Sequence, residues 1–153
     1  MLNMLNRVLI DSGPLIAIFD TDDNHHIAML KFLSKYQCCF VSTIAVFTEV
    51  SHMLDFNTKA QNDFYKWVMH KGVIINDISQ SDMPRLVELT EKYADLPMDF
   101  ADATLLITAE KTGIREIISL DKHFDIYRLS TGKKFAAERL HNLYFPSLRK
   151  SRG

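Results

Sequence analysis

Features that are scarce or missing in this chain of 153 residues exclude several classes of protein. Its only two cysteines are the neighbours Cys38 and Cys39, so neither a disulfide framework nor a Cys-x-x-Cys metal site is expected. No apolar run approaches the roughly 18 residues that a membrane helix needs. Residues 1–7 lack the basic start and the small-residue cleavage site of a signal peptide. We therefore expect a cytoplasmic protein without a membrane segment.

Zinc-binding patterns are also missing. The six histidines form no His-x₃-His pair and no mixed Cys/His pattern with ligand spacing. The sequence shows no internal repeat, linker or low-complexity segment. A chain of this length fits one domain that buries roughly two thirds of its unfolded surface.

Charge is distributed unevenly along the chain. The net charge is −1, yet the 26 residues from Arg128 onward carry +6, which leaves −7 for residues 1–127. A basic end beside an acidic body indicates contact with a polyanion or an intramolecular clamp, and the alternative is a solvated tail that aids solubility. The candidate residues for contact with a polyanion in this region are Lys133, Lys134, Arg139, Arg149, Lys150 and Arg152.

Apolar runs alternate with segments of helical periodicity. Strands are expected at 7–11, 38–42, 73–76 and 116–120, with a candidate fifth at 126–129. Helices are expected at 14–19, 24–35, 43–54, 58–71 and 99–111, with another that starts at 81 or 82. Strands separated by helices imply a parallel sheet covered on both faces. The predicted fold class is α/β, a three-layer α/β/α sandwich around a mostly parallel sheet of four or five strands.

Acidic residues end or interrupt four of the apolar runs. Asp11 and Asp121 each follow a predicted strand, whereas Glu49 and Asp102 lie within apolar segments of predicted helices. In open α/β sheets the ligand crevice lies outside the carboxyl ends of the strands. Acids that converge there would repel one another and favour protonation unless a divalent cation neutralised them. The sequence therefore predicts a magnesium-type acidic site.

Glu49 has both a functional and a structural interpretation. Helical spacing places Val46, Val50 and Met53 next to it, so we expect it beside the apolar stripe of its helix. The structural alternative is a surface pair with His52 at i+3. An exposed pair of this kind contributes little to stability.

The other acids have structural alternatives too. Asp99 and Asp102 would form an N-cap and first-turn pair of the helix at 99–111. Asp121 would cap the turn that follows it, and Asp11 would accept backbone N–H bonds at a corner between strand and helix.

The acidic motifs together resemble a known family. They are Leu9-Ile10-Asp11-Ser12, Ser42-Thr43-x-x-x-x-Thr48-Glu49, Asp99-x-x-Asp102-Ala103 and Ser119-x-Asp121. In this order and spacing they resemble the PIN-domain nucleases, in particular the VapC-type toxins of bacterial and archaeal toxin–antitoxin pairs. The likeness runs from about residue 8 to 124. It implies a flavodoxin-like PIN domain over residues 1–130, with 131–153 as its basic C-terminal extension.

The resemblance also implies an activity, a metal-dependent endoribonuclease that uses Mg²⁺ or Mn²⁺. The implied catalytic residues are Asp11, Glu49, Asp102 and Asp121, and the implied metal ligands are these four together with Asp99. Ser12 and Ser119 would orient water or metal-bound oxygens. Whether Asp99 or Asp102 binds the metal more closely stays open, because many members carry a single acid in this motif.

Partners follow from the resemblance as well: an RNA substrate, a cognate antitoxin and a second copy of the chain in a homodimer. Candidate contact residues on the early helices are Phe32, Leu33, Trp67 and Val68, for which ordinary core packing is the alternative. Other functions stay open: a stand-alone RNA-processing nuclease, a non-catalytic RNA- or protein-binding module, and a phosphoryl-transfer domain of receiver or phosphatase type. Asp11-Ser12-Gly13 lacks the second acid of a phosphatase Asp-x-Asp motif. A nucleophilic serine is not expected, because no histidine–acid pair is placed to activate one.

Overall fold

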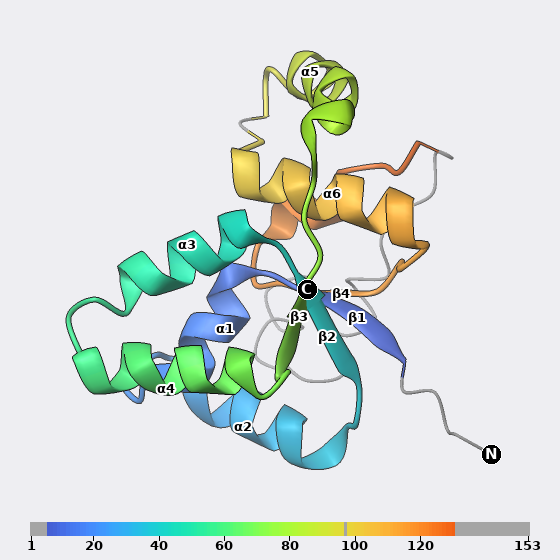
Figure 1. Ribbon diagram of the computed structural model, residues 1–153. Helices are drawn as coiled ribbons and strands as arrows, with labels where there is room; N and C mark the ends of the chain where they lie inside the picture. Colours follow the sequence, from blue (N-terminus) through green and yellow to red (C-terminus); the bar gives the residue numbers. More distant parts are fainter. Residues whose placement is uncertain (1–5, 97, 131–153) are drawn as a thin grey trace, which may run out of the picture.

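A four-stranded, all-parallel sheet forms the centre of the computed structural model, which describes residues 6–96 and 98–130. The strands are β1 (Arg7–Ile10), β2 (Cys39–Ser42), β3 (Val73–Ile75) and β4 (Ile117–Ile118), in the order β3-β2-β1-β4 (Figure 1). β1 therefore lies inside the sheet, with Val8 opposite Phe40 of β2 and Leu9 opposite Ile117 of β4.

Helices cover both faces of this sheet, which confirms the predicted three-layer fold class. They are α1 (Ser12–Phe19), α2 (His26–Lys35), α3 (Ile44–Met53), α4 (Thr58–Met69), α5 (Met83–Lys92) and α6 (Phe100–Thr112). From β1 the chain adds β2 and then β3 toward one edge of the sheet, and it then returns to place β4 on the other side of β1. Right-handed crossovers consequently place α1 to α4 on one face and α5 with α6 on the other. Figure 1 shows α5 and α6 stacked together, apart from α1, α2 and α4.

Polar residues fix where the helices begin. The side chains of Asp11, Thr43, Asn57 and Asp99 accept backbone N–H bonds at the starts of α1, α3, α4 and α6 respectively. At its other end α6 stops at Gly113, whose φ of 77° lies in the left-handed region that favours glycine. Two of these capping residues, Asp11 and Asp99, are acids that the sequence assigned to the metal site.

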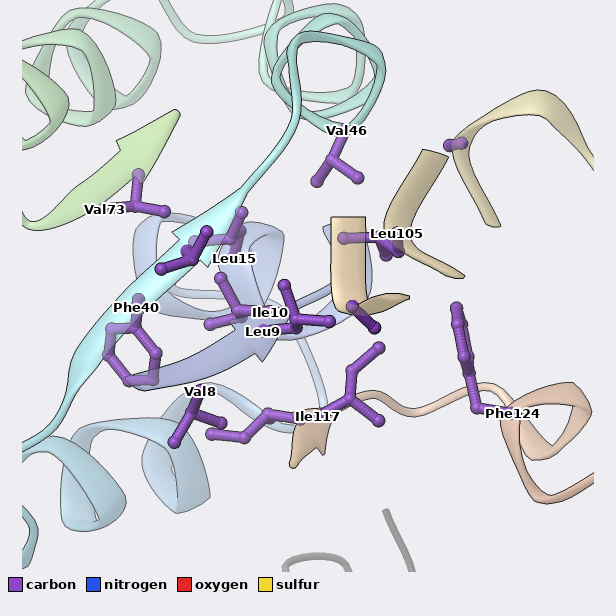
Figure 2. Packing of buried hydrophobic residues seen from close by; sticks show 14 of the residues in the cluster. Val8, Leu9, Ile10, Leu15, Phe40, Val46, Val73, Leu105, Ile117 and Phe124 are labelled. Atoms are coloured by element: carbon purple, nitrogen blue, oxygen red, sulfur yellow. The ribbon is translucent and has the colours of Figure 1, made fainter. Parts of the chain in front are cut away.

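The hydrophobic core lies between the sheet and its helices (Figure 2). Leu9, Ile10 and Ile117 are fully buried, as expected for parallel strands covered on both faces. Every residue of α6 from 101 to 109 is buried, so this helix is central rather than amphipathic. Asp102 lies within this run, and it is therefore held in a desolvated environment.

One expectation about the periphery is wrong, and one of the alternatives left open there is decided. No fifth strand forms within residues 6–96 and 98–130: a short 3₁₀ helix, η2 (Lys122–Asp125), follows β4, and Arg128 makes only an isolated bridge. Among the candidate contact residues on the early helices, Phe32 is buried and therefore belongs to the hydrophobic core. Leu33, Trp67 and Val68 are partly buried against the same core. Of the helices in the described part of the chain, none is long and apolar enough to cross a membrane.

Candidate metal centre

Asp11 is held at the point where β1 ends and α1 begins. Only 6% of it is exposed. Its Oδ1 accepts a hydrogen bond from the Ser12 backbone N–H at 2.8 Å, and its Oδ2 accepts one from Ser119 Oγ at 3.0 Å. Burial raises the pKa of Asp11 to about 6, and these two hydrogen bonds offset only part of that effect.

Asp102 occupies the first turn of α6 and is equally buried, with 5% exposed. Its backbone N–H donates to Asp99 Oδ1 at 2.8 Å, and its Oδ2 accepts a hydrogen bond from the Tyr127 hydroxyl at 3.0 Å. Burial is the largest cause that raises the pKa of Asp102 to about 8, and the negative charges of Asp11 and Asp99 add to it. Near neutral pH without a bound cation, this carboxyl group therefore keeps its proton, because the described residues do not compensate the negative charge of its ionised form.

The other three acids are more accessible to solvent than this pair. Glu49 is partly buried on α3, a helix that packs against α1 and α6. Asp99 is exposed and caps α6. Asp121 precedes η2 and accepts a hydrogen bond from the His123 backbone N–H at 2.9 Å. The capping alternatives for Asp99 and Asp121 are therefore correct in geometry, but they do not exclude a second role.

All five acids line one cleft of about 270 Å³, together with Ser12, Gly13 and Leu120. The cleft lies beyond the carboxyl ends of β1 and β4, where the strand order reverses, which is the usual place for a ligand in a doubly wound sheet. The structure thus brings together every acid predicted for the site. Ser12 lines the same cleft, and Ser119 contacts it indirectly through its hydrogen bond to Asp11.

Some predicted features are not formed or lie elsewhere. Glu49 does not pair with His52, whose imidazole instead lies 3.7 Å from Asp55. Val46 and Val50 are buried beside Glu49 as expected, but Met53 is 54% exposed, so the apolar stripe of α3 is shorter than predicted. The basic candidates from Lys133 to Arg152, and the C-terminal extension 131–153 as a whole, lie outside the described residues.

The donor set fits a hard divalent cation. Within residues 6–96 and 98–130, the lining of the cleft includes five carboxylates and neither lysine nor arginine. Carboxylate oxygens are the ligands that Mg²⁺ and Mn²⁺ prefer. Burial, and then the neighbouring carboxylates, raise the pKa values of Asp11 and Asp102, and a bound cation would favour their charged forms instead. Oδ1 of Asp102 accepts no hydrogen bond from the part of the chain that the structure describes, so it is available as a ligand.

Sequence reasoning missed two residues near this centre. His123 has a ring nitrogen 3.2 Å from Asp121 Oδ1, and potential ligand atoms of Asp102, Asp121 and His123 all lie within 4.8 Å of one another. Tyr127 is fully buried and donates to Asp102. A buried tyrosine hydroxyl needs a partner, but the sequence gives no sign of which one.

Comparisons with known proteins agree with this geometry. The family model of the PIN domain matches residues 8–129. The crystal structure of VapC20 from Mycobacterium tuberculosis, a toxin that cleaves the sarcin–ricin loop, superimposes with a TM-score of 0.67. The two sequences are 15% identical, and the match covers 74% of this chain and 89% of VapC20, so the likeness concerns the fold. No curated protein sequence matches this chain.

Proposed function

Since this chain belongs to the PIN-domain family, we propose that it is a Mg²⁺- or Mn²⁺-dependent endoribonuclease that hydrolyses phosphodiester bonds of RNA. The observation that carries the proposal is the convergence of five acids, from four separate segments of the chain, in one cleft. Asp11, Glu49, Asp102 and Asp121 are the proposed catalytic residues, and Asp99 is a fifth candidate ligand of the metal.

The buried and the accessible acids have different roles in this proposal. Asp11 and Asp102 are the principal ligands, because they are buried and their carboxylates are fixed by hydrogen bonds from Ser119 and Tyr127. Such outer partners orient a ligand and tune its affinity for metal. Glu49 and Asp121 lie at the more solvent-accessible side of the cleft, where they would complete the ligand set and orient the attacking water.

A divalent cation bound by these carboxylates would supply Lewis acidity at the phosphate and lower the pKa of a bound water. The side chains of the protein contribute by holding the carboxylates in fixed positions. The hydroxyls of Ser119 and Tyr127 hold one oxygen each of Asp11 and Asp102, so neither carboxylate has to reorganise when RNA binds. Ser12, at the start of α1, is placed to hydrogen bond a phosphate oxygen within the cleft.

We further propose that the biological role is that of the toxin in a toxin–antitoxin pair. The fold shared with VapC20 supports this role, and the cytoplasm is where its RNA substrate would lie. Its expected partners are a cognate antitoxin and a second copy of the chain. Induced expression in a bacterial host should arrest growth, and Asp102→Asn should abolish the arrest. Light scattering of the purified protein would test the homodimer, and co-purification with the product of a neighbouring gene would test the antitoxin.

A cleavage assay distinguishes this activity from its rivals. Labelled RNA is incubated with the protein and Mg²⁺ or Mn²⁺, with and without EDTA, and the products are resolved on a gel. Internal cleavage that EDTA abolishes is the expected result. Release of inorganic phosphate without strand cleavage would indicate a phosphoryl-transfer domain. RNA binding without cleavage under either metal would indicate a non-catalytic module.

A further inference from the structure

A second and larger cavity adjoins the acidic cleft. This groove has a volume of about 680 Å³ and lies between the start of α3, the segment from β3 to α5 and the start of α6. Glu49 and Asp99 line both the groove and the acidic cleft. Any ligand that fills the groove is therefore immediately next to the candidate metal centre.

Exposed apolar side chains mark the groove as a binding surface. Phe100 is 55% exposed and Ile44 is 44% exposed, and both line it together with Met83. Phe100 is exposed although the nine residues that follow it on α6 are all buried. An aromatic ring that stays in solvent at the entrance of a cavity is suited to stacking against a planar ligand.

The charge of the groove favours a base over a phosphate. Among the described residues, its lining includes the carboxylates of Glu49, Asp77 and Asp99 and contains neither lysine nor arginine. A phosphate would be repelled here, whereas the exocyclic amino groups of adenine, cytosine and guanine donate hydrogen bonds to carboxylates. Gln80 also lines the groove, and its amide makes no hydrogen bond with the described residues, so it is free to pair with the edge of a base.

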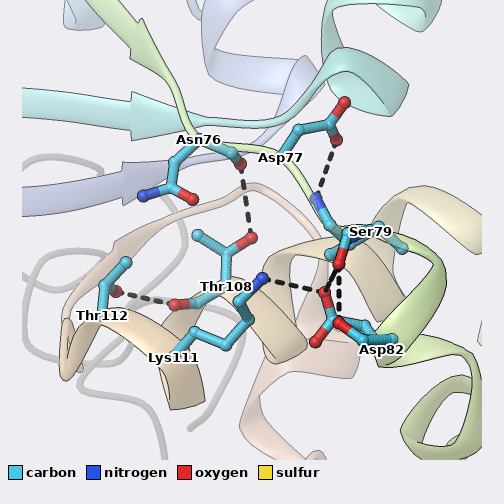
Figure 3. A network of polar contacts seen from close by, with 9 residues as sticks. Asn76, Asp77, Ser79, Asp82, Thr108, Lys111 and Thr112 are labelled. Carbon is cyan, nitrogen blue, oxygen red and sulfur yellow. Dashed lines mark hydrogen bonds and ion pairs between the residues drawn. The ribbon is translucent and has the colours of Figure 1, made fainter.

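One wall of the groove is held in place before any ligand binds (Figure 3). Asp82 Oδ2 accepts hydrogen bonds from the Ser79 backbone N–H and from Lys111 Nζ, both at 2.8 Å. Thr108 of α6 donates to the backbone oxygen of Asn76 at 3.5 Å. These contacts tie the segment that carries Gln80 to α6, so the groove is pre-organised and a ligand does not have to order it.

We propose that this groove binds one unstacked nucleobase of single-stranded RNA, belonging to a nucleotide adjacent to the phosphodiester that is cut. Phe100 stacks on the base, Ile44 and Met83 pack around it, and Gln80 contacts its edge. The inference rests on the proposed endoribonuclease activity and adds to it a subsite that holds the base of a nucleotide beside the cut. Continuity with the acidic cleft argues for this occupant: the two cavities share Glu49 and Asp99, so an RNA strand held at the cleft can place a neighbouring base in the groove.

The test combines a protein variant with a modified substrate. The value of kcat/KM is measured in Mn²⁺ on a short labelled RNA whose cleavage position has been mapped. The same measurement is made on RNAs in which the nucleotide on either side of the cut has lost its base. Phe100→Ala should lower kcat/KM on the intact RNA by on the order of tenfold, within the range for one base–aromatic stack. Phe100→Trp should restore activity.

The abasic substrates separate stacking from a general structural effect. On one of the two abasic RNAs, kcat/KM of the wild type should fall to the value that Phe100→Ala shows on the intact RNA. The kcat/KM of Phe100→Ala should not fall further on that abasic RNA. Phe56→Ala is the matched control, since Phe56 is 63% exposed and lines neither cavity. This control should leave kcat/KM unchanged on every substrate.

Three results would overturn the proposal in distinguishable ways. If the wild type cleaves RNA and Phe100→Ala cleaves it equally fast, the base subsite is wrong while the activity stands. A different outcome is that Phe100→Ala stays slower than the wild type by the same factor on each abasic RNA, while light scattering gives the variant a different assembly mass from the wild type. In that case the groove is an interface between copies of the chain. If the wild type cleaves no RNA in Mg²⁺ or Mn²⁺, the proposed function fails together with its subsite.

Discussion

Ser119 Oγ donates a 3.0 Å hydrogen bond to Asp11 Oδ2 and so joins the end of β4 to the end of β1 across 108 positions of sequence. The same Ser119 oxygen accepts the Asp121 backbone N–H at 2.9 Å. One hydroxyl therefore positions two of the proposed catalytic acids, and it does so at the reversal of strand order where the cleft opens.

Ser119→Ala should impair catalysis most at low pH. The hydrogen bond from Ser119 lowers the pKa of Asp11, so its loss moves that pKa further upward from about 6. The acidic limb of the kcat/KM profile should then shift to higher pH, with a loss of about tenfold near pH 6 that shrinks toward pH 8. Ser51→Ala is the control, because Ser51 bonds only within α3 and to Gln61. A profile that drops uniformly without a shift would contradict this role for Ser119.

Tyr127→Phe should weaken metal binding while the protein stays folded. The variant keeps the ring that packs against Tyr93 and Phe124 but removes the donor to Asp102. Loss of such an outer partner typically lowers metal affinity by about 10- to 100-fold, whereas stability should fall by only about 1 kcal/mol. Calorimetric titration with Mn²⁺ measures the first effect and urea denaturation the second. Tyr65→Phe, at an exposed tyrosine on α4, should change neither quantity.

Stability without metal should fall as the pH rises. The ordinary carboxyl pKa is 3.8, and folding raises it to about 6 for Asp11 and about 8 for Asp102. Above about pH 4 the folded state consequently binds more protons than the unfolded state, so the free energy of unfolding decreases up to about pH 8. Solvent screening at the cleft reduces the effect of these shifts, and we expect a loss of at least about 2 kcal/mol between pH 5 and pH 8 in EDTA.

Asp102→Asn is the variant that isolates this effect, because it removes the group with the larger pKa shift. This variant should be more stable than the wild type at pH 8 in EDTA, and its free energy of unfolding should depend less on pH. Mn²⁺ should stabilise the wild type at pH 8 more than the variant. Urea denaturation at the two pH values, with exposed Asp55→Asn as the control, measures all of these differences. If the free energy of unfolding depends on pH equally in the wild type and in Asp102→Asn, Asp102 is not the source of that dependence.

The basic end of the chain remains a candidate for RNA affinity. Removal of residues 147–153 deletes Arg149, Lys150 and Arg152. If all three contact phosphate, the slope of log K against log salt should fall by up to about 2 for single-stranded RNA. Fluorescence anisotropy over a range of salt concentrations measures this slope. The alternative, a solvated tail, predicts the same slope for the truncated and the full chain.

Much of the fold follows from local sequence signals. Apolar runs with β-branched residues placed the four strands, and polar capping residues such as Thr43 and Asp99 placed helix starts. Once strands and helices alternate, a parallel sheet and its ligand-binding edge follow from topology. The convergence of Asp11 and Asp102 was predictable for this reason.

The parts that sequence did not predict depend on packing between distant elements. The contact from Tyr127 to Asp102 spans 25 positions and arises in a segment without periodicity, where an extended strand was expected. Met53, at the last position of α3, is exposed although its spacing places it on the apolar stripe, and local spacing does not encode where that stripe stops being covered. Phe100 likewise looks like core in an apolar sequence, and only the structure shows it at the entrance of a groove.

The most direct test of the proposed metal-dependent nuclease site is the rate of RNA cleavage at saturating Mn²⁺ for the wild type, Asp11→Asn and Asp102→Asn, with Asp55→Asn as an exposed control. Each of the two buried acids is held by its own hydrogen bonds and faces the shared cleft. Both buried variants should lose cleavage by at least about 100-fold while they remain folded, and the control should cleave like the wild type. Wild-type rates in Asp11→Asn or Asp102→Asn would contradict the assignment of the site.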